Sequence, residues 1–191
     1  MAAPRIAPAP RQGTWTWEDL QALPGDGARR EIIGGELFEM TGPTPEHADA
    51  VRNLLFLLAP FFRALGMTFF TAPLDVFFPG ASPIQPDLFA MRRDGPWSRS
   101  ERGIEGAPEF VIEALSPSTR GRDRLTKRAL YQQAGVREYW LVDVEARSLE
   151  VLVLDGETLV AFSRAAGDEP VRSRMFPGLA FHASAVFRDG D

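Results

Sequence analysis

The sequence predicts one domain of the α/β or α+β class, with a mixed sheet covered by helices. Three observations support this prediction. Apolar residues recur at helical spacing between 51 and 65, buried-strand patterns occur at 110–115 and 136–144, and a β-hairpin signal follows at 148–162. Helices and strands that are interspersed along one chain favour a sheet with helices packed against it.

The size and composition fit a single soluble domain. The chain has 191 residues, of which 45% are hydrophobic and 25% are charged. We expect residues 1–13, rich in Ala and Pro, to form a disordered tail, and residues 14–191 to form the domain. No signal peptide is predicted, and the apolar run 54–62 is too short to span a bilayer, so a cytoplasmic protein with no membrane partner is expected.

Each element follows from a local signal. In the first half of the chain, the patterns predict a short helix within 14–24 capped by Thr14 or Thr16, a hairpin turning at Gly34 and Gly35, a helix from Thr44 that ends by Gly66, and a strand over 67–78. In the second half, they predict a strand at 84–91 that is short or near an edge, a loop at 92–107 and a strand at 110–115. A helix that Gly135 terminates, a strand at 136–144 and a hairpin at Asp155 and Gly156 follow. The last predicted element is a strand or short helix within 172–187 that packs through Phe176, Leu179 and Phe187.

Glu113 is the exception in an otherwise apolar strand. A carboxylate that leaves water without a partner costs several kcal/mol, so the chain must supply a cation, a proton or hydrogen bonds for it. Asp87 begins another predicted strand. If the two strands are neighbours, both carboxylates can meet at one point.

The composition restricts which metal such a point could hold. The chain has no cysteine and two histidines, His47 and His182, so a metal would be a hard one held by oxygens. Mg²⁺ is typically bound by one or two carboxylates and keeps waters and phosphate oxygens as its other ligands. Bound beside a phosphodiester, it activates a water as the nucleophile.

Lys127 is the only lysine, because 20 of the 21 basic residues are arginine. It lies on the helix that follows Glu113, with Tyr131 four residues later on the same face. We expect the ammonium group to reach back toward Glu113. There it would position a water or stabilise charge that develops on phosphate oxygens.

A local basic segment surrounds this lysine. Residues 120–128 contain five basic residues and one acidic residue, although the net charge of the chain is −5. The acidic balance argues against a protein that coats DNA nonspecifically. The arginines of this segment form either a solvated face or contacts to a DNA backbone, and these candidates are Arg120, Arg122, Arg124 and Arg128.

Several ordered segments resemble a known family. "REIIGGEL", "TPEH", "QPDLF", "PEFVIEALSPST", "DRLTKRALYQQAGVREYWLVD" and "FPGLAF" together resemble the bacterial Uma-two family of restriction-endonuclease-like proteins, within the PD-(D/E)XK nuclease superfamily. The similarity spans roughly residues 28–181. It implies a restriction-endonuclease-like mixed central sheet flanked by helices, with additional β-hairpins near both ends of the domain.

The resemblance also implies site residues. Asp87 and Glu113 match the metal ligands, with Mg²⁺ or Mn²⁺ as the cofactor. The superfamily's lysine usually lies two residues after the glutamate, where this sequence has Leu115, and Lys127 matches the position of a substitute from the following helix. Glu31 and His47 match further family positions, and with Tyr131 we count them as residues around the ligands.

Purely structural roles remain alternatives for these residues. Glu113 could form only a structural ion pair with Lys127 or a nearby arginine. His47 is better explained by a local hydrogen bond in the first helical turn than by a role as a general base. Glu31 could equally pair with Arg29 or Arg30.

The leading hypothesis is a Mg²⁺- or Mn²⁺-dependent endonuclease that hydrolyses DNA. The alternative is a nuclease-fold DNA-binding or accessory module without turnover. A glycosidase with two catalytic carboxylates is weaker, because the neighbouring basic residues favour an anionic substrate. A homodimer is expected, since two equivalent sites suit the cutting of two antiparallel strands.

Overall fold

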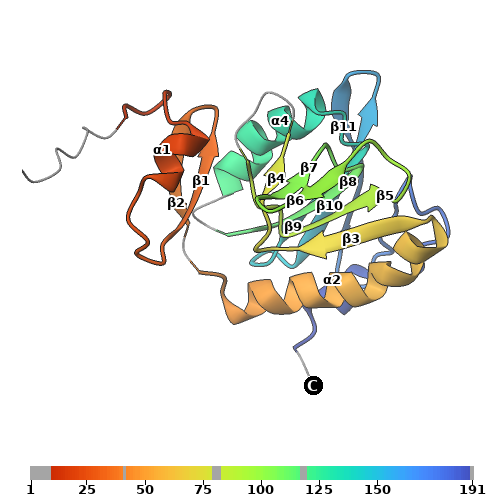
Figure 1. Cartoon of the computed structure of the whole chain (residues 1–191). Coiled ribbons are helices and arrows are strands. Elements are labelled where there is room, and N and C mark those ends of the chain that lie inside the picture. The colour runs from red at the N-terminus through yellow and green to blue at the C-terminus, as the bar shows by residue number, and fades with distance from the viewer. Residues whose placement is uncertain (1–9, 41, 79–82, 117–119, 190–191) are drawn as a thin grey trace, which may run out of the picture.

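A six-stranded mixed sheet forms the centre of the molecule (Figure 1). The computed structural model describes residues 10–40, 42–78, 83–116 and 120–189. The strands, in the order β11–β10–β9–β8–β5–β3, are β11 (Thr158–Ala166), β10 (Ser148–Asp155), β9 (Glu138–Asp143), β8 (Phe110–Leu115), β5 (Leu88–Arg92) and β3 (Met67–Thr71). Only the β8–β9 pair is parallel within this sheet. The predicted mixed sheet is therefore confirmed.

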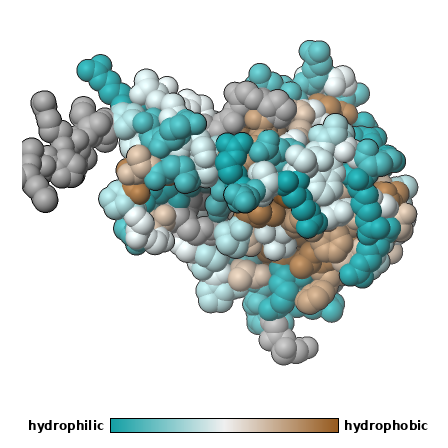
Figure 2. Space-filling model, in the orientation of Figure 1, coloured by the Kyte–Doolittle hydropathy of each residue, from teal (hydrophilic) through white to brown (hydrophobic). Residues whose placement is uncertain are grey.

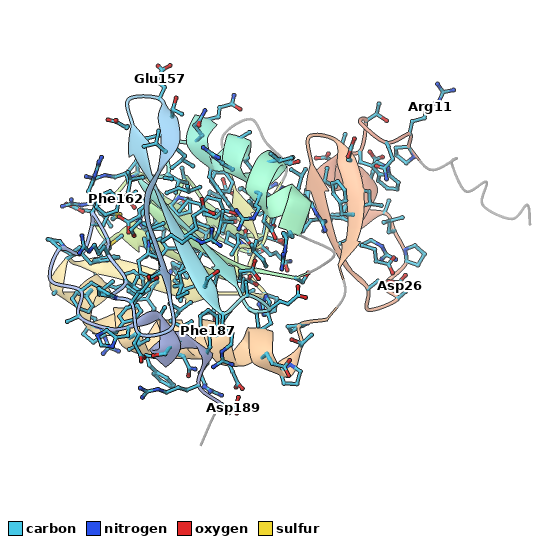
Figure 3. The ribbon with its side chains drawn as sticks, turned by 180° about the vertical axis from the view of Figure 1, so that it is seen from behind. Arg11, Asp26, Glu157, Phe162, Phe187 and Asp189 are labelled. Atoms are coloured by element: carbon cyan, nitrogen blue, oxygen red, sulfur yellow. The ribbon has the colours of Figure 1, made fainter. Side chains whose placement is uncertain are left out.

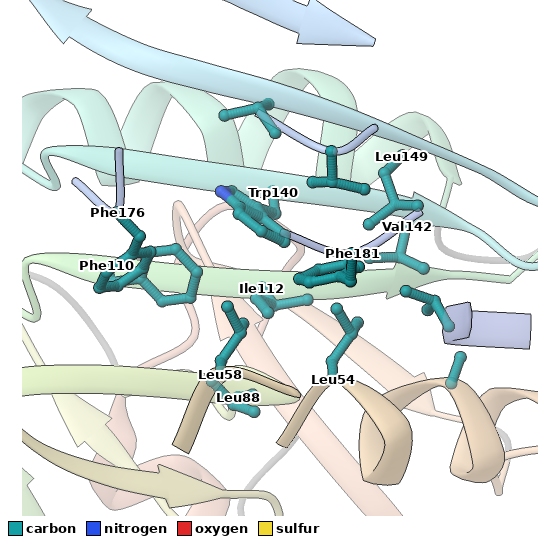
Figure 4. Close-up of a cluster of buried hydrophobic side chains, with 14 of the residues drawn as sticks. Leu54, Leu58, Leu88, Phe110, Ile112, Trp140, Val142, Leu149, Phe176 and Phe181 are labelled. Carbon is teal, nitrogen blue, oxygen red and sulfur yellow. The ribbon is translucent and has the colours of Figure 1, made fainter. Parts of the chain in front are cut away.

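Helix α2 (Pro45–Ala64) covers one face of the sheet. It begins as predicted, because the Thr44 side chain accepts a hydrogen bond from the His47 backbone N–H at 3.3 Å and Pro45 needs no such partner. Leu54 and Leu58 point from the helix toward strand residues such as Ile112 (Figure 4). The helical spacing seen in the sequence thus becomes one side of the larger apolar core.

The opposite face carries a helical segment in three parts. These are α3 (Arg120–Arg122), the π-helix η1 (Asp123–Lys127) and α4 (Arg128–Gln133). The helix was predicted to end at Gly135, and this residue has a positive φ of 78° that favours glycine. The π-helical turn was not predicted. Such turns are rare and frequently mark functional sites, and this one contains Lys127.

The N-terminal part forms a small layer beside the main sheet (Figure 1). Helix α1 (Trp17–Gln21) starts with a capping box between Thr16 and Asp19, one of the two predicted caps. Strands β1 (Arg29–Ile33) and β2 (Glu36–Met40) form the predicted hairpin. Of the predicted tail, residues 1–9 lie outside the described residues, whereas the Gly13 backbone N–H donates to the Gly35 carbonyl at 2.9 Å.

Two predictions around residues 67–107 were wrong. The strand predicted over 67–78 ends at Thr71, because Pro73 cannot donate a ladder hydrogen bond. The chain then enters a three-stranded sheet of β4 (Val76–Phe77), β7 (Gly103–Glu105) and β6 (Ser98–Ser100), which occupies part of the predicted loop. Gly103 permits this arrangement, since a Cβ there would collide with the Asp75 carbonyl.

The strand predicted at 84–91 is present but begins later. Pro86 precedes it, and β5 starts at Leu88. It is short, as expected, but it lies between β3 and β8 rather than at the edge. Asp87 therefore stands just before an interior strand.

The C-terminal part follows the predicted order. Strands β10 and β11 form the expected hairpin, whose turn carries Gly156 and Glu157 and points into solvent (Figure 3). The last segment contains the short 3-10 helix η2 (Ala183–Phe187). Phe176 and Phe187 are buried and Leu179 is partly buried, so this segment closes the core against α2.

Hydrophilic residues cover much of the face seen in Figure 2, and apolar residues gather over the region of β3 and α2. Within the described ranges, no helix has both the length and the apolar character needed to cross a bilayer.

Glu138 anchors the C-terminal segment to the sheet. It is fully buried at the start of β9. One carboxyl oxygen accepts from the Trp140 indole at 2.7 Å and the Ser173 hydroxyl at 2.6 Å. The other accepts from the backbone N–H groups of Arg174 and Met175 at 3.0 and 2.9 Å. One side chain thus satisfies four donors, of which the Trp140 indole and the Ser173 hydroxyl are buried.

Replacing this carboxyl group should destabilise the fold. We expect Glu138→Ala to lower the free energy of unfolding by about 3 kcal/mol or more, because four donors lose their acceptor. Urea unfolding measures the change, and Glu157→Ala at the exposed hairpin turn is the control. Equal stability of the two variants would contradict the anchoring role.

Candidate active site

The strand register brings Asp87 and Glu113 together. In the antiparallel β5–β8 pair, Leu88 stands opposite Ile112, which places Asp87 beside Glu113. The backbone N–H of Ala114 donates to Asp87 Oδ2 at 2.8 Å and fixes that carboxylate against β8. The predicted meeting of the two carboxylates is therefore observed, and neighbouring strands produce it.

Lys127 reaches Glu113 from the π-helical turn. Its Nζ lies 3.0 Å from Glu113 Oε1, and the Tyr131 hydroxyl donates to the same oxygen at 2.5 Å. All three side chains are buried. The predicted contact of the only lysine with the exceptional glutamate is confirmed.

Two more carboxylates surround the ammonium group. Glu31 Oε2 on β1 and Asp123 Oδ1 on η1 each lie 3.5 Å from Lys127 Nζ. Of the two alternative partners predicted for Glu31, Arg30 instead pairs with Asp26 at 2.6 Å, and the side chain of Arg29 lies outside the described part of the structure. Asp123 was not among the predicted site residues. Its position four residues before Lys127 was the signal that could have found it.

Burial and the neighbouring charges together set the pKa values in this cluster. Burial raises the pKa of Glu113 well above its usual value, although the Lys127 ammonium opposes that shift. Burial alone would lower the pKa of Lys127, but the carboxylates of Glu113, Glu31, Asp123 and Asp87 outweigh it and raise the pKa. Burial and Glu113 also raise the pKa of Tyr131. Lys127 therefore stays charged at neutral pH. Tyr131 stays protonated and donates a hydrogen bond to Glu113.

His47 approaches the other carboxylate from α2. Its Nε2 lies 3.2 Å from Asp87 Oδ2. The expected local hydrogen bond also exists, but the backbone N–H makes it, to the Thr44 side chain. The imidazole thus belongs to the surroundings of Asp87.

The four arginines of 120–128 have intramolecular contacts. Arg120 pairs with Asp143 and Glu145, both at 3.0 Å, and Arg124 pairs with Glu150 at 2.7 Å. The Arg122 guanidinium lies 4.3 Å from the centre of the Phe38 ring, and Arg128 donates to the Leu159 carbonyl at 2.5 Å. The segment is therefore tied to the sheet and to the N-terminal hairpin, and its contact with nucleic acid stays a prediction.

The donor atoms suit a hard cation. Asp87 and Glu113 offer carboxylate oxygens from adjacent strands, and Mg²⁺ typically takes one or two carboxylates and completes its shell with water and substrate oxygens. Over the described residues, no group of three or more His, Asp or Glu side chains is arranged to hold a metal by itself. A two-carboxylate site that is completed by other ligands is the arrangement that these residues fit.

A solved structure of another protein shares this fold. A crystal structure of a putative nuclease of the DUF820 family from Anabaena variabilis matches with a TM-score of 0.71 and 20% sequence identity. The match covers 90% of this chain and 97% of that one, so this is a nuclease-like α+β fold. Among curated proteins no match was found.

The chain belongs to the Uma2 family, which is described as putative restriction endonuclease. The family model matches residues 17–184, nearly the whole domain. The resemblance noted in the sequence is therefore confirmed, and the coarse class is that of a nuclease.

Removing the ammonium group should make stability depend more steeply on pH. The raised pKa of Glu113 means that the native state holds this proton more tightly than the unfolded chain, so its contribution to stability falls as pH rises above the ordinary carboxyl range. In the Lys127→Met variant, no ammonium group offsets this loss of stability. We expect the variant to lose about 3–5 kcal/mol at pH 8 and clearly less at pH 5.

Thermal melts at both pH values with a chelator present measure this difference. Thr126→Ala, an exposed position on the same turn, is the control and should change little at either pH. An equal loss for Lys127→Met at pH 5 and pH 8 would show that Lys127 does not neutralise the buried carboxylates.

Proposed function

We propose that this chain is a metal-dependent endonuclease that hydrolyses DNA phosphodiester bonds, with Asp87 and Glu113 as the ligands of Mg²⁺ or Mn²⁺. The supporting observation is the convergence of Asp87, Glu113 and Lys127 from two adjacent strands and the following helical segment. Family membership supports the nuclease class. The metal requirement and the DNA substrate belong to the proposal.

The protein groups would divide the work by their chemistry. A bound divalent cation supplies Lewis acidity and lowers the pKa of a coordinated water. Lys127 orients Glu113 through Oε1, positions the attacking water and stabilises charge on the phosphate oxygens. The Ala114 N–H and His47 Nε2 hold Asp87 in place.

We propose further that the enzyme acts as a homodimer in the cytoplasm. Two equivalent sites related by a two-fold axis match the two antiparallel strands of a duplex. Arg120, Arg122, Arg124 and Arg128 are the proposed contacts to the DNA backbone. Among them Arg120 and Arg124 are partly neutralised by carboxylates, whereas Arg128 is bound to a neutral carbonyl.

The central test is a plasmid-nicking assay with Mn²⁺. Purified protein should convert supercoiled plasmid to the open circle, and Asp87→Asn or Glu113→Gln should each lower the rate by about 100-fold or more. Asp94→Asn is a matched control, because Asp94 is an exposed carboxylate beyond the other end of β5. Nicking that survives both site substitutions would contradict the proposal.

The second candidate is a nuclease-fold DNA-binding module without turnover. The burial of Lys127 among three carboxylates favours it, because an ammonium group held in this way is not exposed to a substrate. Salt-dependent binding of DNA with no product in any divalent metal would support this module over the enzyme.

The proposed backbone contact of Arg128 has a separate test. We expect Arg128→Gln to weaken DNA binding and to reduce the salt slope of the binding constant by about one, as expected for one lost phosphate contact. Arg93→Gln is the control, because Arg93 follows β5 at the end opposite Asp87. Filter binding at several salt concentrations measures both slopes. Equal slopes for the two variants would remove Arg128 from the interface.

A further inference from the structure

Glu31 touches both halves of the candidate site with one carboxylate. Its Oε1 accepts from the backbone N–H of Gln85 at 3.0 Å, two residues before Asp87. Its Oε2 lies 3.5 Å from Lys127 Nζ and has no hydrogen-bond partner among the residues that the structure describes. The side chain is only 4% exposed. One residue of the N-terminal hairpin therefore links the segment that carries Asp87 to the ammonium group on Glu113.

The position of Glu31 is fixed from both sides. Ile33, two residues along β1, lies in the same apolar cluster as Tyr131. On the other strand of the hairpin, the Phe38 ring contacts the Arg122 guanidinium of the helical segment. Figure 1 shows the hairpin beside the end of this segment. The hairpin thus docks on the element that carries Lys127.

The segment on the other side of Glu31 is also held. The Gln85 side chain donates to Asp75 Oδ1 at 3.0 Å, just before β4. Gln85 is therefore fixed through its side chain by Asp75 and through its backbone by Glu31. Because Gln85 and Asp87 are close in sequence, a shift of Glu31 would reach Asp87 as well as Lys127.

We propose that Glu31 is a positioning residue, which sets the spacing between the Asp87 segment and Lys127. Its Oε1 holds the backbone of Gln85, and its Oε2 faces the Lys127 ammonium group. Asp123 holds the same ammonium group from its own turn, at 3.5 Å. The N-terminal hairpin then completes the site, although it lies outside the central sheet. The catalytic meaning of this contact rests on the proposed function, whereas the contact itself can be tested without it.

Substitution by glutamine separates the two contacts. Glu31→Gln keeps one oxygen to accept from the Gln85 N–H, but it places an NH₂ donor toward the Lys127 ammonium. If the amide turns over, the oxygen faces Lys127 and the Gln85 contact is lost instead. Either way one of the two links fails, with almost no change in side-chain volume.

The single lysine makes the readout specific. The rate of Nζ acylation by an amine-reactive acetate ester, followed by peptide mass spectrometry, reports how firmly Lys127 is held in its buried position. We expect Glu31→Gln to raise this rate by about tenfold, because the buried ammonium group loses one of the three carboxylates that hold it. Glu39→Gln is the matched control, since Glu39 is an exposed carboxylate on the partner strand β2 of the same hairpin.

Unchanged acylation of Lys127 in a folded Glu31→Gln variant would overturn the proposal, whatever the nuclease assays give. If the wild type nicks DNA, the variant should lower kcat with little change in KM, because the contact acts on the reacting groups and not on DNA binding. A rise in KM alone would also overturn it. Faster acylation in a protein that never cleaves DNA would instead refute the proposed function.

Discussion

The ion pair between Lys127 and Glu113 is the interaction on which the site depends. A carboxylate inside the sheet is costly, and the ammonium group 3.0 Å away compensates part of that cost. Three carboxylates share this one ammonium group. The cluster therefore lacks positive charge when all its acids are ionised, and an added proton or a divalent cation would supply it. This is the physical link between the buried cluster and the metal chemistry of the proposal.

The fold places these groups on elements of different kinds. Asp87 and Glu113 come from adjacent antiparallel strands, so the sheet sets the distance between them. Lys127 comes from a π-helical turn, a local irregularity in a short helical segment. Glu31 comes from a hairpin outside the sheet. A rigid pair of carboxylates is thus surrounded by residues whose placement depends on how smaller layers dock.

Much of the arrangement could be predicted from residues. Thr44, Pro45 and the apolar spacing that follows define α2, and an apolar run on both faces defines the buried strands. Glu113 and Lys127 could be singled out because each is an exception, a charge in a buried strand and a lone lysine among arginines. The prediction of one strand over 67–78 was wrong. The apolar alternation continues past Pro73, but the hydrogen-bond ladder between strands cannot, because proline has no backbone N–H.

By itself the sequence determined the central strands, the long helix, the family resemblance and the pairing of the exceptional glutamate with the only lysine. The tertiary structure decided which distant residues surround that pair and Asp87, because Glu31 and His47 come from segments whose docking no local pattern encodes. It also decided that Arg120 and Arg124 bind carboxylates of the sheet. Local signals specify elements, whereas contacts between distant charges exist only once those elements have packed.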